Sequence, residues 1–255
     1  MHTYLIFMRK FFICLLLLAG INMLHAQDST KTKTKISPSV KQKIGKAQDR
    51  IVVDLCLMNA LFDKDGVRTP KDFKVSGFSR GVNVYFMWDV PLGKKKNFAI
   101  APGAGIGSEN YYFKRYGMAW HKDSITRFYA LNDSISSKKS KLNMTYFDIP
   151  LEVRYRSTPN AKTGQSWKLA LGFKLGFLMG SKWKYVGEDL DNSGENVKFK
   201  DLKVANMAKL RYGVYIRGGY SLANLFFYYS LSETFNKGKG PTMHPLVFGI
   251  SINGL

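Results

Sequence analysis

The chain has 255 residues, of which 45% are hydrophobic and 14% aromatic, and its formal net charge is +21. This length suits one large β domain, because barrels of this size often form a single unit. The high positive charge is compatible with binding to nucleic acid, contact with an acidic cell surface, or simple solubility. The N-terminal sequence narrows these three explanations of the charge.

Residues 1–26 have the three parts of a secretory signal peptide. Arg9 and Lys10 precede an apolar run over residues 11–24, and Ala26 supplies a small residue at the expected cleavage point. An uncleaved membrane anchor is the alternative, but the run is marginal in length for a span. We therefore predict cleavage after Ala26 and export through the Sec pathway, which argues against a nucleic-acid partner inside the cell.

The processed chain would begin with a polar, lysine-rich segment, residues 27–50, for which we predict a flexible basic lead in the periplasm. Cys56 is the single cysteine that remains after cleavage, so no internal disulfide can form. His121 and His244 are the two remaining histidines, which leaves few ligands for a metal centre.

Residues 51–255 contain eight segments in which apolar residues recur with a period of two, as in β-strands. The clearest is residues 167–185, where the odd-numbered residues from Trp167 to Tyr185 carry no charge and the even-numbered ones are mostly glycine, alanine and lysine. A helix would scatter its lysines over several faces, and each of its glycines would cost about 1 kcal/mol. The predicted strands are residues 51–62, 78–90, 98–112, 142–156, 167–185, 208–220, 225–232 and 243–254.

Short and long connections alternate along these predicted strands. Residues 91–97, 157–166 and 221–224 are short connections, whereas four longer ones separate the other neighbouring strands. All long loops would therefore emerge at one end, which is typical of outer-membrane barrels. We predict an all-β, eight-stranded antiparallel up-and-down transmembrane barrel, with a soluble exported barrel or sandwich as the alternative.

Charged residues in the strands fall on the face opposite the large apolar side chains. A charge on the lipid face near the bilayer centre costs about 2–4 kcal/mol, so the apolar face is expected to contact lipid and the charged face to line a filled lumen. A lipocalin-like barrel would do the reverse. Unpaired buried charge is costly, so we predict a structural charge network in the lumen formed by Asp89, Asp148, Glu152, Arg154, Lys174, Arg211 and Arg217. A proton or ion path along the same residues is the functional alternative.

Aromatic residues lie towards the ends of the predicted strands, on the apolar face. Such residues form interfacial girdles in membrane barrels, although aromatic residues also favour strands in general. The predicted girdle residues are Trp88, Tyr155, Trp167, Trp183 and Tyr185.

Three runs resemble the PorT-like small outer-membrane β-barrel proteins of Bacteroidota: SRGVNVYFMWDVPLG at residues 79–93, FAIAPGAGIGS at 98–108 and YFDIPLEVRYR at 146–156. The resemblance extends over most of the processed chain. It implies an outer-membrane barrel and, because some members belong to the type IX secretion and gliding apparatus, an accessory role in a secretion or surface-assembly machine. It brings no catalytic motif. The chain departs from the family by ending in Leu255 rather than in an aromatic residue.

Candidate chemistry is sparse. His121 and Asp123, in the longest loop, could act as a base and its orienting group, but no nucleophile motif accompanies them. Glu188, Asp189 and Asp191 could bind calcium weakly. We predict a non-enzymatic barrel without cofactor, metal or small-molecule substrate, with a loop enzyme and a small channel as alternatives. The expected partners are outer-membrane lipid, lipopolysaccharide phosphates met by lysine-rich loops, and proteins of a secretion complex.

Overall fold

The computed structural model describes residues 50–94, 96–119, 125–132, 137–188 and 195–253. The predicted signal peptide and all of the basic lead except Arg50 lie outside these residues, and both remain predictions. Leu255 also lies outside them. In the described part of the chain, no helix is long and apolar enough to cross a membrane.

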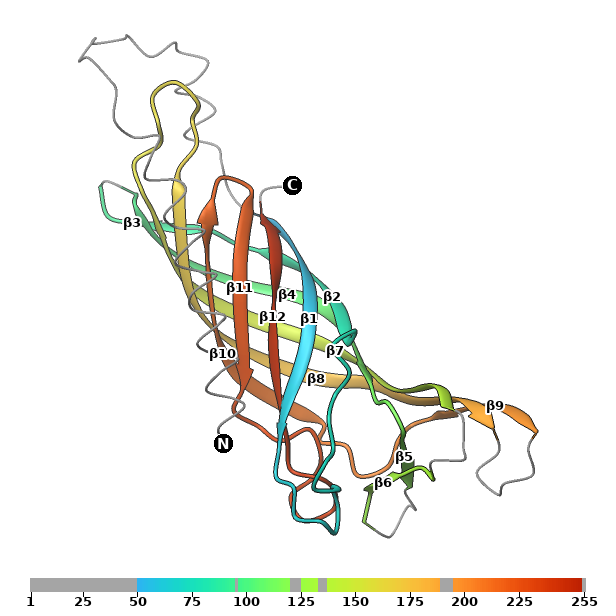
Figure 1. The fold of residues 1–255 in the computed structure, drawn as a ribbon. Helices are drawn as coiled ribbons and strands as arrows, with labels where there is room; N and C mark the ends of the chain where they lie inside the picture. The colour runs from blue at the N-terminus through green and yellow to red at the C-terminus, as the bar shows by residue number, and fades with distance from the viewer. Residues whose placement is uncertain (1–49, 95, 120–124, 133–136, 189–194, 254–255) are drawn as a thin grey trace. The chain divides into compact units, whose positions relative to one another are not determined.

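Eight antiparallel strands form a closed barrel (Figure 1). Each strand pairs with its neighbours in sequence order, and the last strand, β12, pairs with β1 to close the sheet. This arrangement confirms the predicted eight-stranded up-and-down barrel. The barrel strands are β1 (Ile51–Phe62), β2 (Arg80–Met87), β4 (Phe98–Tyr112), β7 (Ser137–Arg156), β8 (Trp167–Glu188), β10 (Leu210–Tyr220), β11 (Ala223–Ser230) and β12 (Met243–Asn253).

Four short strands accompany the barrel. β3 (Val90–Leu92) pairs with the start of β4, so the predicted strand at residues 78–90 is interrupted after Met87. β5 (Tyr116–Ala119) and β6 (Arg127–Ala130) form a hairpin between β4 and β7. β9 (Asn196–Leu202) pairs with the second half of β8, beyond the part of β8 that pairs with β10.

The two ends of the barrel differ, as the connection lengths predict. Short turns join β7 to β8 and β10 to β11, and β2 reaches β4 through the brief β3 segment. The other connections are long and carry β5, β6 and β9, which gather at one end in Figure 1. We call these the short-turn end and the long-loop end.

The outer surface of the barrel is apolar because side chains of a strand alternate between its two faces. In β1, Leu55 and Leu57 point outwards, whereas Asp54 and Cys56, which alternate with them, are buried. On β8 the outward residues run from Trp167 to Met179, about 40 Å along the strand. At the tilt usual for such barrels this projects to about 30 Å, the thickness of a bilayer's hydrocarbon core. We call this outward surface the apolar belt.

One prediction about β8 is wrong: Trp183 and Tyr185 point into the barrel, and each side chain is 1% exposed. The reason is a β-bulge. Gly180 lies opposite Thr145 and Leu178 opposite Tyr146, which leaves Met179 as an extra residue without a partner on β7. An extra residue reverses the alternation of side chains beyond it. Lys182 and Lys184, which the alternation had placed in the lumen, therefore point outwards.

The remaining predicted girdle residues do lie on the outer surface. Trp88, Tyr155 and Trp167 are 61%, 40% and 55% exposed. They lie at the short-turn end, where the ring of Trp167 packs 5.2 Å from that of Tyr220 and the ring of Tyr155 lies 5.1 Å from that of Phe98. The aromatic girdle at this end is thus built from three of the five predicted residues.

Candidate functional site

The interior of the barrel changes character along its axis. β7 illustrates this, because its inward residues run from Arg154 and Glu152, through Asp148, to Tyr146 and then to apolar residues. The lumen therefore has a charged section towards the short-turn end and an apolar section towards the long-loop end. The structure places all seven residues of the predicted lumen network in the charged section, with side chains at most 6% exposed.

The ion pairs nearest the short-turn end centre on Glu152. Arg154 donates from Nε to Glu152 Oε2 at 2.6 Å and from Nη1 to Asp89 Oδ1 at 2.9 Å. Arg217 pairs with the other oxygen of Glu152. Charge-assisted hydrogen bonds of this kind offset the desolvation of the buried groups, and such groups are stable only when paired.

A second group of ion pairs centres on Asp148, deeper in the barrel. Arg211 donates from Nη2 to Asp148 Oδ2 at 2.9 Å, and Lys174 Nζ lies 3.5 Å from the same oxygen. Arg211 also stacks over the ring of Tyr146, with its guanidinium carbon 3.6 Å from the ring centroid. Lys174 Nζ lies 4.2 Å from the centroid of the Tyr228 ring, at cation–π distance.

The structure adds residues that the predicted network lacked. Glu109 pairs with Arg211, Asp54 pairs with Arg217 at 3.1 Å, and Arg156 pairs with Asp89. The signal for Glu109 was available, because continuing the alternation of residues 98–107 places it on the inner face. Together, these ten side chains comprise five carboxylates and five cations: Asp54, Asp89, Glu109, Asp148 and Glu152, with Arg154, Arg156, Lys174, Arg211 and Arg217.

Two tyrosine hydroxyls complete the pairing, and glycines leave room for it. Tyr85 donates to Asp148 Oδ2 at 3.1 Å, and Tyr215 donates to Glu152 Oε1 at 2.8 Å. A Cβ at Gly176 would lie 2.4 Å from Asp148 Oδ1, and one at Gly172 would lie 2.2 Å from the Tyr215 ring. The glycines on the inner face of β8 therefore make space for the charged and aromatic side chains of neighbouring strands.

The charged section of the lumen has little free space around Glu152. A cavity between Glu152, Arg154 and Arg217 has a volume of about 10 Å³. A cavity needs roughly 10–15 Å³ to hold one water molecule. Neighbouring side chains therefore fill this part of the lumen.

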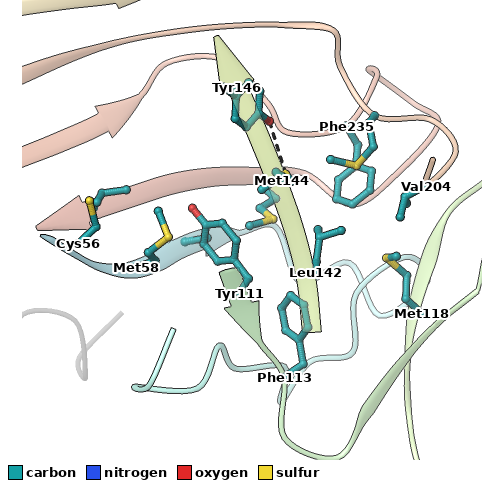
Figure 2. Packing of buried hydrophobic residues seen from close by; sticks show 14 of the residues in the cluster. Cys56, Met58, Tyr111, Phe113, Met118, Leu142, Met144, Tyr146, Val204 and Phe235 are labelled. Atoms are coloured by element: carbon teal, nitrogen blue, oxygen red, sulfur yellow. Dashed lines mark hydrogen bonds between the residues drawn. The ribbon is translucent and has the colours of Figure 1, made fainter. Parts of the chain in front are cut away.

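At the long-loop end, an aromatic cluster closes the apolar section of the lumen. The ring of Phe128 lies 4.5 Å from that of Phe73 and 6.4 Å from that of Phe235, and Trp183 stacks 5.8 Å from Phe113. We call these five residues the aromatic cap. Figure 2 shows Phe113 and Phe235, with Met118 and Val204, gathered around the Leu142 end of β7.

All four long connections take part in this closure, since buried cluster residues come from each of them: Phe73, Phe128, Val204 and Phe235. Backbone hydrogen bonds also join one connection to another. Thr126 N donates to Lys239 O at 3.0 Å, and Asn236 N donates to Asn206 O at 2.8 Å. The long loops thus fold together over the barrel mouth.

A tight turn orders the first of these loops. Asp65 Oδ1 accepts from the backbone N–H groups of Val67, Arg68 and Thr69 at 2.9, 2.7 and 3.2 Å, and Oδ2 accepts from Arg68 Nε at 2.7 Å. Desolvation by itself would raise the pKa of the Asp65 carboxyl. The hydrogen bonds from Arg68 and the backbone outweigh that effect and hold the pKa well below its usual range.

The other candidate residues give no site that can be built. His121, Asp123, Asp189 and Asp191 lie outside the described residues, while Glu188 is the last residue of β8. Among the described residues, no group of three or more histidine, cysteine, aspartate or glutamate side chains is placed to hold a metal ion.

A closed antiparallel barrel with an apolar outer belt and a charged interior defines a transmembrane barrel of the outer-membrane class. The model of the outer membrane protein beta-barrel domain family matches residues 50–236, and the chain belongs to this family. It is therefore an outer-membrane β-barrel protein.

Comparison with solved structures and curated sequences adds little to this assignment. Two similar structures are those of Ail, the attachment invasion locus protein of Yersinia pestis, alone and in complex with the heparin analogue sucrose octasulfate. Their sequence identities are 9% and 10% and their TM-scores 0.34 and 0.35, and in each case the match covers 80% of this chain and 95% of Ail. No curated protein sequence matches significantly.

Proposed function

We propose that this protein is a non-conducting, non-enzymatic outer-membrane barrel with a structural or interaction role, and that its closed long-loop end is the interaction surface. One observation carries the proposal: four separate loops fold into a single cap over the lumen, held by buried aromatic contacts and loop-to-loop hydrogen bonds. A pore needs an open path, whereas a binding surface needs preorganised loops.

The proposal also assigns a structural role to the lumen charges. Five carboxylates pair with five cations inside the barrel. Side chains held by such pairs are not free to carry ions through the lumen, because unpairing a buried charge is costly. We assign the network to barrel stability rather than to transport.

The topology in the membrane is part of the proposal. We infer that the chain is exported through the Sec pathway with cleavage after Ala26, that residues 27–50 lie in the periplasm, and that the long loops are extracellular. The support is general, since outer-membrane barrels have short periplasmic turns and longer outer loops.

Labelling of intact cells tests this topology. Val67→Cys lies in a long loop, where Val67 is 64% exposed, and Lys162→Cys lies in the exposed short turn after β7. The native Cys56 is buried. A membrane-impermeant maleimide should label the first variant and not the second; the reverse pattern would overturn the orientation.

Conductance and cross-linking test the role. The full chain, refolded into planar bilayers, should give no conductance steps under conditions in which a porin control does. A photo-reactive residue at Val67 should then cross-link to the same proteins in several preparations of living cells, whereas one at Lys162 should not. Reproducible conductance steps, or cross-links from Lys162 alone, would contradict the proposal.

A narrower proposal follows from the PorT-like resemblance of residues 79–93, 98–108 and 146–156: the protein is an accessory of a secretion or surface-assembly machine. Identification of the cross-linked proteins by mass spectrometry tests this. Recovery of components of one secretion complex would support it, and recovery of lipid adducts alone would refute it. For the alternative of a loop enzyme, His121→Ala should leave any hydrolase activity of the purified protein unchanged.

A further inference from the structure

Beyond the apolar belt, three neighbouring strands carry lysines on one outward face. β7 contributes Lys139 and Lys141, β8 contributes Lys182 and Lys184, and β9 contributes Lys198 and Lys200. The strand register aligns three of them in a row, because Lys141 lies opposite Lys184, and Lys184 lies opposite Lys200. Lys139 and Lys198 flank Val186 in the next row. We call these six residues the lysine face.

The β8 bulge creates this face. Before Met179 the even-numbered residues of β8 point into the barrel, and beyond it they point outwards. The inner side of the same segment is packed: Trp183 belongs to the aromatic cap, and Tyr185 stacks 5.2 Å from Phe199 of β9. The lysines are therefore held outwards by the buried residues with which they alternate.

The charges of the lysine face repel one another. Residues directly opposite on neighbouring strands have Cβ atoms about 5 Å apart, and like charges at such positions are destabilising. Partial desolvation, and the ammonium groups of Lys198, Lys139, Lys141 and Lys200, lower the pKa of Lys184 from its usual value. An anion bound between these lysines would relieve the repulsion.

Among the described residues of β8 and β9, two carboxylates border the lysine face. Asp201 lies opposite Trp183, on the inward side of β9, whereas Glu188 lies opposite Asn196, on the outward side of β8 and one row beyond Lys198. The partners of Lys141 on β4 are neutral. Lys141 Nζ donates to Asn110 Oδ1 at 2.8 Å, and it lies 5.5 Å from the centroid of the Tyr112 ring.

The face lies at the outer edge of the polar layer of a membrane and just above it. Lys182 and Lys184 lie three and five residues beyond Met179, or about 10 and 17 Å along the strand. At the usual tilt of about 45° they stand about 7 and 12 Å above the belt along the membrane normal. The headgroup layer is roughly 5–7 Å thick on each side of a bilayer, so Lys182 lies at the outer edge of this layer and the row of Lys184 about 5 Å beyond it.

We propose that the lysine face binds the phosphate groups of lipopolysaccharide in the outer leaflet around the barrel. It is continuous with the lipid-facing belt, it begins at the outer edge of the headgroup layer, and its charge complements a phosphorylated glycolipid. This inference rests on the proposed orientation, in which the long-loop end is extracellular. The binding itself can be measured without that orientation.

The test uses two variants of the full chain with equal changes in charge. The first replaces the central row, Lys141→Gln, Lys184→Gln and Lys200→Gln. The control replaces three exposed lysines of the long loops outside the face, Lys71→Gln, Lys74→Gln and Lys237→Gln. A third variant, with arginine at the three central positions, keeps the charge. Heat-modifiable migration on a gel confirms that each protein folds.

Affinity for purified lipopolysaccharide is measured with the proteins in detergent micelles or nanodiscs. A lysine near an anionic surface contributes roughly a fivefold factor, so the central-row variant should bind about a hundredfold more weakly. The control and the arginine variant should stay within about threefold of the original. Removing the lipid A phosphates, or adding salt, should weaken binding by the original protein. Equal losses in the central-row variant and the control would overturn the inference.

A second binding measurement distinguishes lipopolysaccharide from a soluble phosphate compound as the ligand. The labelling experiment distinguishes failure of this inference from failure of the proposed orientation. If the face binds inositol hexakisphosphate but not lipopolysaccharide, a soluble polyanion is the occupant and the proposal is wrong. If lipopolysaccharide binds as expected in vitro but Val67→Cys is not labelled from outside, the orientation fails while the binding specificity stands, and the physiological assignment to the outer leaflet is overturned.

Discussion

Replacing Asp148 by asparagine is the sharpest test of the lumen network. Asp148 is buried and accepts hydrogen bonds from Arg211 and Tyr85, with Lys174 Nζ 3.5 Å away. Asparagine keeps the shape and the hydrogen-bond acceptor for Tyr85, but it removes the counter-charge of two buried cations. Breaking a buried ion pair by removing one partner costs about 3–5 kcal/mol.

The structure places the expected loss for Asp148→Asn at the lower end of this range, about 3 kcal/mol, because Glu109 still pairs with Arg211. The assay is urea unfolding of the refolded chain in lipid vesicles, followed by tryptophan fluorescence. Asp201→Asn removes an exposed carboxylate of β9 and should change the free energy of unfolding by less than about 0.5 kcal/mol.

A double-mutant cycle strengthens the test. Arg211→Met should also be strongly destabilising, because it leaves Glu109 and Asp148 without their common partner. The double variant with Asp148→Asn should lose at least about 1.5 kcal/mol less than the two single losses together, as expected for residues in direct contact. A loss below about 1 kcal/mol for Asp148→Asn, together with additive effects in the cycle, would refute the argument that these pairs stabilise the barrel.

Three further predictions concern the packing of β8, each measured by the same unfolding assay. Gly176→Ala should destabilise the barrel by about 1–3 kcal/mol, since its Cβ would lie 2.4 Å from Asp148 Oδ1, whereas Gly180→Ala should be nearly neutral because nothing lies within 4 Å. Equal effects would contradict the assigned packing. Trp183→Ala should cost about 3–5 kcal/mol by leaving a cavity in the aromatic cap, and Trp88→Ala, on the outer surface, clearly less. Deletion of Met179 should remove the bulge, keep Leu178 and Gly180 opposite Tyr146 and Thr145, and leave Trp183 buried in a barrel that still shows heat-modifiable folding; loss of the folded form or solvent-exposed Trp183 fluorescence would show that Met179 is not an extra residue in the pairing of β7 with β8.

Much of the lumen could be predicted from sequence because a barrel strand has only two faces. Once residues 167–179 were given an apolar outer face, the parity of each neighbouring strand placed Asp148, Lys174 and Arg211 inside. Which carboxylate meets which cation depends on register and tilt across several strands. Those pairings, including that of Glu109 with Arg211, required the tertiary structure.

Beyond the bulge at Met179, the alternation of odd and even residues no longer predicts which side chains point into the barrel. The local alternation of residues 167–185 does not indicate that one residue is left unpaired there, because the even positions other than Leu178 are glycine, alanine or lysine on both sides of Met179. Beyond the bulge, Trp183 points inwards because it is buried in the aromatic cap at the long-loop end. At that end no lipid would cover an apolar outer face.

The sequence by itself therefore determined the class of fold, since strand periodicity, loop asymmetry and the exclusion of charges from one face are local properties of the chain. It also placed seven of the ten charged side chains of the lumen network inside the barrel, near the short-turn end. Only the tertiary structure decided the closure of the long-loop end and the exposure of the lysine face. Both depend on contacts between loops and strands far apart in the chain, and on one extra residue in β8, which exchanges the inward and outward faces of the strand beyond it.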